Sequence, residues 1–346
     1  MTVRFGLIGC GQIGQLRASA LGQLRSGRLT AVSDVRLESA RELAEKYRTA
    51  VHADWQSLIK SETVDAVIVS TPPSMHAQMC TEALEAGKHV LCEKPLALTP
   101  AEGRRMLESA ERSGCFLATG FNFRFYPSFQ KARELLDAGV IGNLAHVRSY
   151  AGYSAAEQTQ AWLRSPEVVG GGALRDNGIH LIDLTRYFLG EVAEVRGFSS
   201  SSVWELPGCE DNGFMVLRSP SGQLGSLQAS WTEWRGYRFM VELVGTHGYI
   251  RASCFPMMAQ VIRANKPGGR TRQNMHLFPM SNLMERVRSY RWIVTQSLVQ
   301  ELDAFTRAIR GEVTALATGA DGLRALEIAD QVACNSIGRS TAPWPT

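Results

Sequence analysis

The sequence predicts an α/β N-terminal domain with a parallel sheet, followed by a C-terminal α+β domain with a large open antiparallel sheet. Three observations predict this class. The chain has 346 residues, enough for about two domains that each bury a core. Short apolar runs alternate with amphipathic helical patterns through the first third of the chain. Later apolar runs follow one another without helices between them, so we place the domains at 1–121 and 122–346.

Composition and charge exclude several classes of protein. Charged residues make up 20% and hydrophobic residues 45% of the chain, which is typical of folded proteins. The net charge of +4 is too small to indicate nucleic acid or an acidic membrane as a partner. No apolar run approaches the roughly 18 residues of a membrane span, and the first run, Val3–Ile8, is strand-like and not a secretory leader. The seven scattered cysteines contain no C-x-x-C pair, which indicates reduced thiols and a cytoplasmic location.

The first domain is predicted to alternate strands with helices. Apolar runs of strand length occupy Val3–Ile8, Leu29–Ser33, Ala66–Ser70 and His89–Cys92, with Cys115–Thr119 as an edge strand. Helical patterns cover residues 12–24 and 37–47, and a third helix begins with a capping box at Thr99 and Glu102 and stops at Gly114. Because the strands are apolar throughout, we expect right-handed βαβ units in a parallel sheet with both faces covered.

The second domain is predicted to open with a helix over 128–138. Five strands follow, at residues 145–153, 194–203, 213–218, 224–231 and 239–244, and helices at 298–311 and 323–337 close the chain. Consecutive strands indicate an antiparallel sheet. We expect Trp231, Trp234 and Tyr237 to be sheet or interface residues.

A glycine-rich loop follows the first strand. Gly9, Gly11 and Gly14 form the pattern G-x-G-x-x-G, and Gln12 and Ile13 open the helix behind it. The first glycine permits the tight turn, the second lets a pyrophosphate approach the backbone, and the third lets the helix pack against the strand. The free N–H groups and positive end of the helix then face the phosphates. This context predicts a Rossmann domain that binds a dinucleotide.

Asp34 ends the second strand, 20 residues after Gly14. A carboxylate at this place accepts hydrogen bonds from the adenosine ribose diol and repels a 2′-phosphate, so we expect NAD as the cofactor. Arg36 could pair with such a phosphate, which leaves NADP open as the alternative.

Lys94 follows the fourth strand, in the run Glu93-Lys94-Pro95. Ligands of open α/β sheets bind outside the carboxyl ends of the strands. Lys94 is the only one of the six lysines placed at such an end, and its ammonium could hydrogen-bond a substrate oxygen and stabilise negative charge there. Pro95 would fix the backbone that aims the lysine, through a trans or a cis bond. Position alone fits a solvated lysine equally well.

An acid–histidine pair follows the glycine triplet 170–172. Asp176 and His180 are four residues apart in a predicted helix, so they would share one face, with Asp183 close by. A histidine can take a proton from an alcohol, and a neighbouring carboxylate raises its basicity and fixes its tautomer. The spacing also fits a surface ion pair or a helix cap. No third ligand accompanies the pair, so we expect no metal.

Together these motifs resemble the Gfo/Idh/MocA family of NAD(P)-dependent oxidoreductases, which includes inositol and glucose–fructose dehydrogenases. The motifs are residues 9–14, 71–76 (T-P-P-S-M-H), 93–95 (E-K-P), 120–125 (G-F-N-F-R-F) and 170–183 (G-G-G-x-x-x-D-x-G-x-H-x-x-D). The resemblance implies that Lys94, Asp176 and His180 are catalytic and also touch the substrate. It places further residues around the ligands: Thr71, Pro72, His76 and Glu93 beside the cofactor, and Asn122 and Arg124 in the substrate pocket. We add Trp162 and Arg164, which could stack on and hydrogen-bond a sugar ring.

The resemblance implies oxidation of a secondary hydroxyl of a sugar, cyclitol, sugar nucleotide or other sugar derivative by NAD. It also implies a homodimer or homotetramer that assembles through the C-terminal sheet. Two alternatives stay open: an NAD-dependent glycoside hydrolase that oxidises its substrate transiently, and a non-catalytic cofactor-sensing protein of the same fold.

Overall fold

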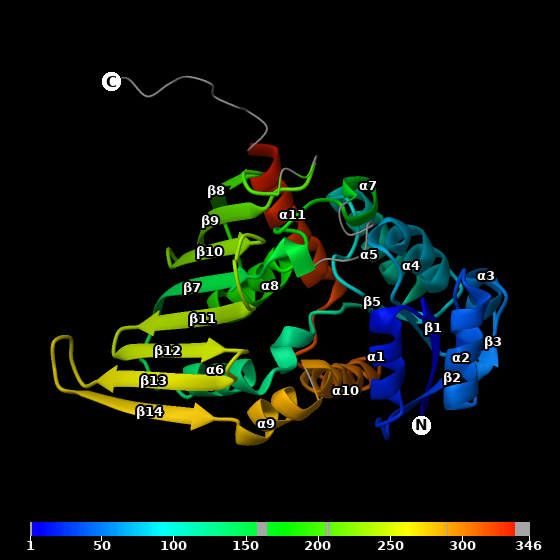
Figure 1. The fold of residues 1–346 in the computed structure, drawn as a ribbon, viewed down its shortest axis with the longest axis horizontal. Coiled ribbons are helices and arrows are strands. Elements are labelled where there is room, and N and C mark those ends of the chain that lie inside the picture. The colour runs from blue at the N-terminus through cyan, green and yellow to red at the C-terminus, as the bar shows by residue number, and fades with distance from the viewer. Residues whose placement is uncertain (1, 158–164, 205, 207, 289, 336–346) are drawn as a thin grey trace.

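The structure is a computed structural model that describes residues 2–157, 165–204, 206, 208–288 and 290–335 (Figure 1). The parallel sheet of the first domain and the larger sheet of the second lie side by side with helices between them. Trp162 and Arg164 lie outside the described residues, so their expected contacts with a sugar stay predictions.

The first sheet is parallel, and its six strands run in the order β3-β2-β1-β4-β5-β6. Its strands are β1 (Val3–Ile8), β2 (Gly27–Ser33), β3 (Ala50–Val51), β4 (Ala66–Val69), β5 (His89–Cys92) and β6 (Leu117–Thr119). The helices are α1 (Gln12–Leu21), α2 (Leu37–Tyr47), α3 (Trp55–Ile59), α4 (His76–Glu85), preceded by the 3₁₀ turn η1 (Pro73–Met75), and α5 (Pro100–Ser113). All four β4 residues are buried, as a strand covered on both faces requires. The predicted parallel Rossmann sheet is confirmed, with β6 at its edge.

The second sheet has eight strands in the order β14-β13-β12-β11-β7-β10-β9-β8. They are β7 (Leu144–Gly152), β8 (Glu194–Ser200), β9 (Asn212–Arg218), β10 (Leu224–Ser230), β11 (Arg238–Gly245), β12 (Gly248–Ser253), β13 (Met258–Ala264) and β14 (Thr271–Leu277). Neighbouring strands are antiparallel, as predicted, except for the parallel pair of β7 and β10. That pair arises because a helix lies between β7 and β8 and returns the chain to the same end of the sheet.

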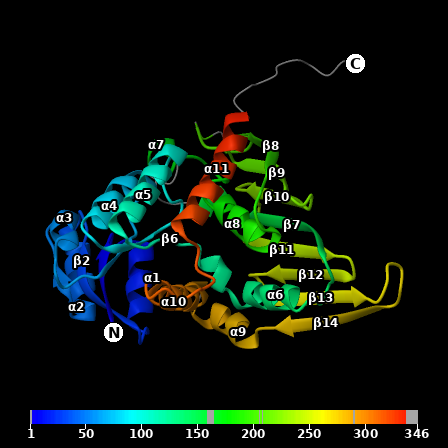
Figure 2. The same cartoon turned by 180° about the vertical axis from the view of Figure 1, so that it is seen from behind.

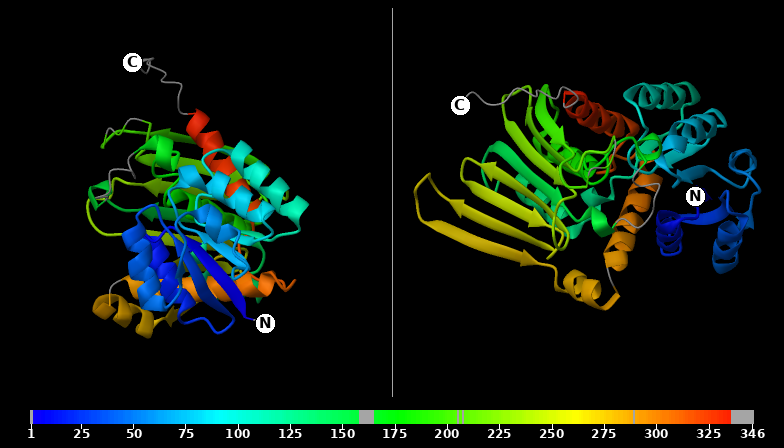
Figure 3. Two further views of the ribbon diagram at one scale, coloured as in Figure 1. Left: turned by 90° about the vertical axis from the view of Figure 1, so that its right-hand side faces the viewer. Right: turned by 45° about the horizontal axis from the view of Figure 1, so that its top comes forward.

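Helices line the side of the large sheet that faces the first domain (Figure 3, right). They are α6 (Pro127–Asp137), α8 (Gly178–Leu189) and α11 (Gly319–Asn335). The short helical turns are η2 (Asn122–Phe125), η3 (Ala155–Glu157) and α7 (Pro166–Val169), of which η2 and α7 contribute residues to the crevice. Helix α9 (Pro279–Arg288) follows the β13–β14 hairpin. The apolar residues of α8, with Ile179, Leu181 and Ile182 nearly unexposed, pack on β7 and β10.

Helix α10 (Tyr290–Ala308) returns from the second domain to the first and lies along α1, as both faces of the molecule show (Figures 1 and 2). Its residues Leu298, Leu302 and Phe305 belong to the core under β1, where the Phe305 ring lies 6.1 Å from that of Phe5. Helix α10 thus connects the two domains on one side of the crevice between them.

Candidate active site

The glycine loop borders a cavity of about 470 Å³ at the carboxyl end of β1 and β2. Gly9 has a φ of +94°, and a Cβ added at Gly14 would lie 2.0 Å from the carbonyl oxygen of Gly9. By contrast, a Cβ at Gly11 would meet nothing within 4 Å. The first and third glycines are therefore required by the fold itself, and the second leaves the open space that a pyrophosphate needs.

Asp34 lines the same cavity. Its Oδ2 accepts a hydrogen bond of 2.7 Å from the backbone N–H of Cys10, so the carboxylate is tied to the glycine loop. Its Oδ1 accepts from the N–H of Arg36, whose own side chain is 71% exposed with Nε 3.8 Å from that oxygen. This cavity, the uncapped N-terminus of α1 and Asp34 together fit the adenosine half of a dinucleotide.

A second cavity of about 470 Å³ continues from the first, and Ser70, Thr71 and Pro72 line both. Nine of the predicted site residues line it: Gln12, Ile13, Thr71, Pro72, Glu93, Lys94, Asn122, Asp176 and His180. Residues from both domains therefore meet beside the glycine loop, although they are up to 168 positions apart in the chain.

Lys94 is bound to Asp176. Its Nζ donates to the carbonyl oxygen of Asp176 and to the Oδ1 of that residue, both at 3.0 Å. The Lys94–Pro95 peptide bond is cis. The other carboxylate oxygen of Asp176 accepts from the hydroxyl of Tyr153 and, at 3.2 Å, from Nε1 of Trp231. Burial acts to raise the pKa of Asp176, but Lys94, Tyr153 and Trp231 outweigh it and lower this pKa. Asp176 is therefore an anion that fixes the ammonium of Lys94.

The expected pairing of Asp176 with His180 is wrong in its geometry. Helix α8 begins at Gly178, so Asp176 lies in the preceding turn and does not share a helix face with His180. Within the described part of the chain, the carboxylate of Asp176 accepts hydrogen bonds from Lys94, Tyr153 and Trp231. The sequence spacing had assumed a helix that starts one turn earlier.

His180 is held by aromatic rings. It stacks on Phe123 at a centroid distance of 4.4 Å and meets Phe121 edge-on. Burial lowers the pKa of His180 well below its usual value; Lys94 lowers it further, and Asp176 opposes this. Its Nδ1 is buried and has no hydrogen-bond partner among the described residues. At neutral pH the imidazole is therefore uncharged and able to accept a proton.

His76 stands behind the cavity and joins two of its walls. Its ring nitrogens lie 2.8 Å from the carbonyl oxygen of Pro95 and 2.9 Å from that of Thr71. Burial lowers the pKa of His76, while the two carbonyl groups oppose the shift. The side chain is completely buried, so it orients the Thr71 turn and the Lys94–Pro95 segment without reaching the cavity.

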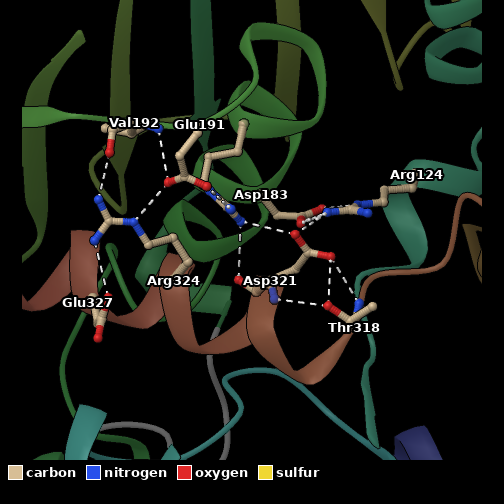
Figure 4. Close-up of polar contacts among 9 residues, drawn as sticks. Arg124, Asp183, Glu191, Val192, Thr318, Asp321, Arg324 and Glu327 are labelled. Carbon is tan, nitrogen blue, oxygen red and sulfur yellow. Dashed lines mark hydrogen bonds and ion pairs between the residues drawn. The ribbon is translucent and has the colours of Figure 1, made fainter. Parts of the chain in front are cut away.

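The structure places Arg124 away from the cavity, against the expectation that it lines the substrate pocket. Figure 4 shows it paired with Asp183, with Nε 2.9 Å from Oδ2, and facing Asp321 of α11. Both partners of the pair are buried, and burial raises the pKa of Asp183. Asp183 therefore does not accompany His180 either: one turn along α8, it points to η2 and α11 instead.

Sequence reasoning missed the residues that hold Asp176 and its loop. Tyr153 directly follows β7 and Trp231 directly follows the neighbouring strand β10, and nothing in their sequence pattern separates them from ordinary sheet aromatics. Glu210 accepts hydrogen bonds from the N–H groups of Gly172 and Leu174, and a Cβ at Gly172 would lie 1.9 Å from its carbonyl oxygen. The glycine triplet was the visible signal: it marks a close approach, but not the segment before β9 that is approached.

In the described ranges, no three histidine, cysteine, aspartate or glutamate side chains gather in a way that could hold a metal ion. Within the same ranges, every helix is too short or too polar to cross a membrane.

Known sequence families match both domains. Residues 3–121 match the family described as "Oxidoreductase family, NAD-binding Rossmann fold" (GFO_IDH_MocA), and residues 129–251 match "GFO/IDH/MocA C-terminal domain". The fold and site thus define an NAD-binding oxidoreductase. Relatives that match nearly the whole chain identify the family within this class of oxidoreductases.

The chain is 33% identical over 329 residues to the myo-inositol 2-dehydrogenase of Thermotoga maritima, a match that covers 94% of this chain and 93% of that protein. It is 30% identical over 336 residues to the inositol 2-dehydrogenase of Rhizobium meliloti, covering 95% and 96%. A solved structure of levoglucosan dehydrogenase in complex with NADH shares the fold, with a TM-score of 0.86 at 23% identity over 97% of each chain. The chain belongs to the Gfo/Idh/MocA family of oxidoreductases, which confirms the resemblance and NAD as the cofactor.

Proposed function

We propose that this protein is a dehydrogenase that oxidises a secondary hydroxyl of a cyclitol, sugar or sugar derivative with NAD. One observation carries the proposal: Lys94 and His180, from different domains, line one cavity that continues into the cavity of the glycine loop. The full-length relatives are inositol 2-dehydrogenases by name, which supports a polyol as the substrate class.

The chemistry divides between the cofactor and the chain. Bound nicotinamide would accept a hydride from the alcohol carbon. The ammonium of Lys94, fixed by Asp176, would donate a hydrogen bond to the substrate oxygen and orient it. The neutral imidazole of His180 would take the hydroxyl proton, a contribution of about 10²–10⁴ in rate. Asn122, at the cavity wall with its amide bound to Ser297, would contact the substrate.

The adenosine ribose would bind at Asp34, whose carboxylate is already oriented by the N–H of Cys10. Because this carboxylate would repel a 2′-phosphate, we propose a preference for NAD over NADP. Arg36 lies beside Asp34 with a largely exposed side chain, and it would allow weaker binding of NADP by pairing with the 2′-phosphate.

We also propose assembly of identical subunits through the large sheet. Phe198 and Phe214 are paired across β8 and β9 and are 75% and 52% exposed, and Val216 and Leu224 extend the same apolar face. An apolar sheet face of this kind is typical of subunit interfaces.

The test is a panel of cyclitols, sugars and sugar nucleotides, each incubated with NAD or NADP while absorbance reports reduced cofactor. We expect wild-type protein to oxidise at least one polyol or sugar with NAD. Lys60→Ala is the control: it alters an exposed lysine of the first domain, which also contains Lys94, and should be equally active. Cleavage of a glycoside without net NADH would contradict a simple dehydrogenase. Cofactor binding with no turnover of any panel member would favour a cofactor-sensing protein.

A further inference from the structure

A buried charge cluster lies directly behind Lys94. Arg17, on the cofactor-binding helix α1, is completely buried and faces two carboxylates. Its Nε is 2.7 Å and its Nη2 is 2.6 Å from Oε1 of Glu93, and its Nη1 donates to Oε2 of Glu301 on α10. One guanidinium thus joins the dinucleotide helix, the segment after β5, and the helix that fastens the two domains.

The cluster is tightly enclosed. A Cβ added at Gly120 would lie 2.8 Å from Nη2 of Arg17 and 3.1 Å from a carboxylate oxygen of Glu93. Glu301 is fully buried, and its Oε1 has no hydrogen-bond partner in the described part of the chain. Burial of charge is unfavourable unless the charges are paired, and here one guanidinium pairs with a carboxylate on each side.

Glu93 connects this cluster to the reaction centre. It precedes Lys94 in the chain, and its side chain lines the same cavity. Glu93 and Asp176 are the two carboxylates among the described lining residues, and Lys94 is bound to Asp176. If Glu93 were unpaired, it would offer the ammonium of Lys94 a second anion inside one cavity.

We propose that Arg17, anchored by Glu301, is a positioning residue for the reaction: it pairs with Glu93 and so keeps the ammonium of Lys94 on Asp176. The inference rests on the proposed function, because the proposed function gives Lys94 a substrate to orient. It adds a residue of the cofactor-binding helix that acts on the substrate side of the crevice without touching substrate or cofactor. Arginine suits this place because its planar fork can serve two carboxylates at once.

The test uses lysine labelled with ¹⁵N at Nζ, since the chain has only six lysines and Lys94→Arg assigns the signal. In Arg17→Met we expect the Lys94 signal to move, and in Arg17→Met with Glu93→Gln we expect it to return toward wild type, because the competing anion is gone. Arg4→Met is the matched control: it breaks the Arg4–Asp65 pair, which is about one third exposed and remote from the cavity, and should leave the signal in place.

Kinetics provide the second reading. With a substrate found in the panel, Arg17→Met should lose about tenfold or more in kcat while KM for NAD stays within about threefold, because Lys94 is misplaced and the glycine loop is intact. Adding Glu93→Gln should recover kcat to the level of Glu93→Gln alone. A general loss of structure would instead alter KM and would not be relieved by the second substitution.

The Lys94 signal and the kinetics together distinguish failure of the proposed function from failure of the role of Arg17. If wild-type protein oxidises no member of the panel, the proposed function fails, and the Lys94 signal still decides the role of Arg17. An unmoved signal in folded Arg17→Met, or a displacement that Glu93→Gln does not reverse, overturns the inference. Should Arg17→Met not fold, Arg17→Met with Glu301→Met replaces the buried pair by apolar side chains of similar length and leaves Glu93 unpaired for the same measurement.

Discussion

At the scale of single residues, the carboxylate of Asp176 fixes Lys94, while His180 is held by other residues. Asp176 gives its oxygens to Lys94, Tyr153 and Trp231, so it fixes a cation. His180 is left between aromatic rings, where burial keeps it uncharged. The result is one charged donor and one neutral acceptor in a single cavity. Under the proposed function, the donor would orient the substrate hydroxyl and the acceptor would take its proton.

Asp34 determines the cofactor preference in this account. Asp34→Ser removes the charge that accepts from the ribose and repels a 2′-phosphate, so kcat/KM for NAD should fall about 10- to 100-fold. The value for NADP should fall less or rise, since Arg36 remains nearby. The ratio of the two values, measured on one protein, cancels any general damage to the glycine loop. An unchanged ratio would show that Asp34 does not discriminate between the cofactors.

We predict that Glu301 makes the stability of the protein depend on pH. Burial raises its pKa in the folded state from 4.5 to about 7, against the opposing effect of Arg17. Between these values the folded protein holds a proton that the unfolded chain has released, so wild-type stability falls as the pH rises through this window. Glu301→Gln cannot titrate, and relative to wild type it should gain up to about 3 kcal/mol between pH 5 and pH 8.

Urea unfolding at the two pH values measures this gain. Glu312→Gln, which changes an exposed glutamate paired with Arg307, is the control and should show no comparable gain. Equal pH dependence in wild type and Glu301→Gln would mean that Glu301 is ionised throughout the range.

Residue types at the site were predictable where the chain itself fixes the geometry. The glycine loop and Asp34 belong to one local βαβ unit, and Lys94 follows a strand whose end must face the crevice. The partners of Asp176 were not predictable, because Tyr153 and Trp231 reach it through sheet register. Arg124 was wrongly expected in the substrate pocket for a different reason: its pairing with Asp183 depends on how η2 packs against α8.

At the scale of elements, the function depends on where helices begin. Helix α1 begins directly after the glycine loop, and no side chain caps its first turn, which leaves its N–H groups for phosphate. Helix α8 begins at Gly178, two residues after Asp176, so the acid stays in a turn fixed by Glu210 through Gly172. The N-terminus of α1 thus presents backbone N–H groups, and the turn before α8 presents Asp176.

Two glycines of the loop can be separated experimentally. Gly11→Ala places a methyl group in open space, so we expect wild-type thermal stability and at least about tenfold weaker NADH binding. Gly14→Ala forces a Cβ to within 2.0 Å of the Gly9 carbonyl oxygen, so it should lower both stability and binding. Thermal melting and NADH fluorescence titration measure the two effects. Wild-type affinity in Gly11→Ala would mean that the pyrophosphate lies elsewhere.

Elements with a strong apolar pattern were predictable to within a few residues, as β1 and α2 show. Strands β12, β13 and β14 were not predicted. In β14 six of seven residues are exposed, so the alternation that identifies a strand is missing. Helix α10 was predicted only over its buried second half, because its first half has fewer buried positions.

At the scale of the whole molecule, the crevice exists because the chain crosses between domains more than once. Helix α10 packs on α1, and an isolated bridge joins Ala118 to Thr318 ahead of α11. Helices of the second domain therefore lie between the two sheets, as Figure 3 shows, and the opposite face of the large sheet carries exposed apolar residues. One face of the sheet supports the cavity, and the other carries the apolar residues that we propose as the subunit interface.

That second face is open to a direct test. Phe198→Asp with Phe214→Asp places two charges on facing positions of β8 and β9, so a sheet-mediated oligomer should dissociate into smaller species by light scattering. Val313→Asp, at a residue 97% exposed in a loop, is the matched control and should keep the wild-type mass. An unchanged mass in the double variant would place the interface elsewhere.

The proposed roles of Lys94 and His180 are decided by the turnover of a protein carrying both Lys94→Met and His180→Gln, with NADH binding determined on the same sample. We predict a loss of at least about 10³-fold in kcat and cofactor binding within a few-fold of wild type, because the two side chains serve the substrate hydroxyl and the glycine loop is unaltered. A folded, NADH-binding double variant that oxidises the substrate at the wild-type rate would contradict the account.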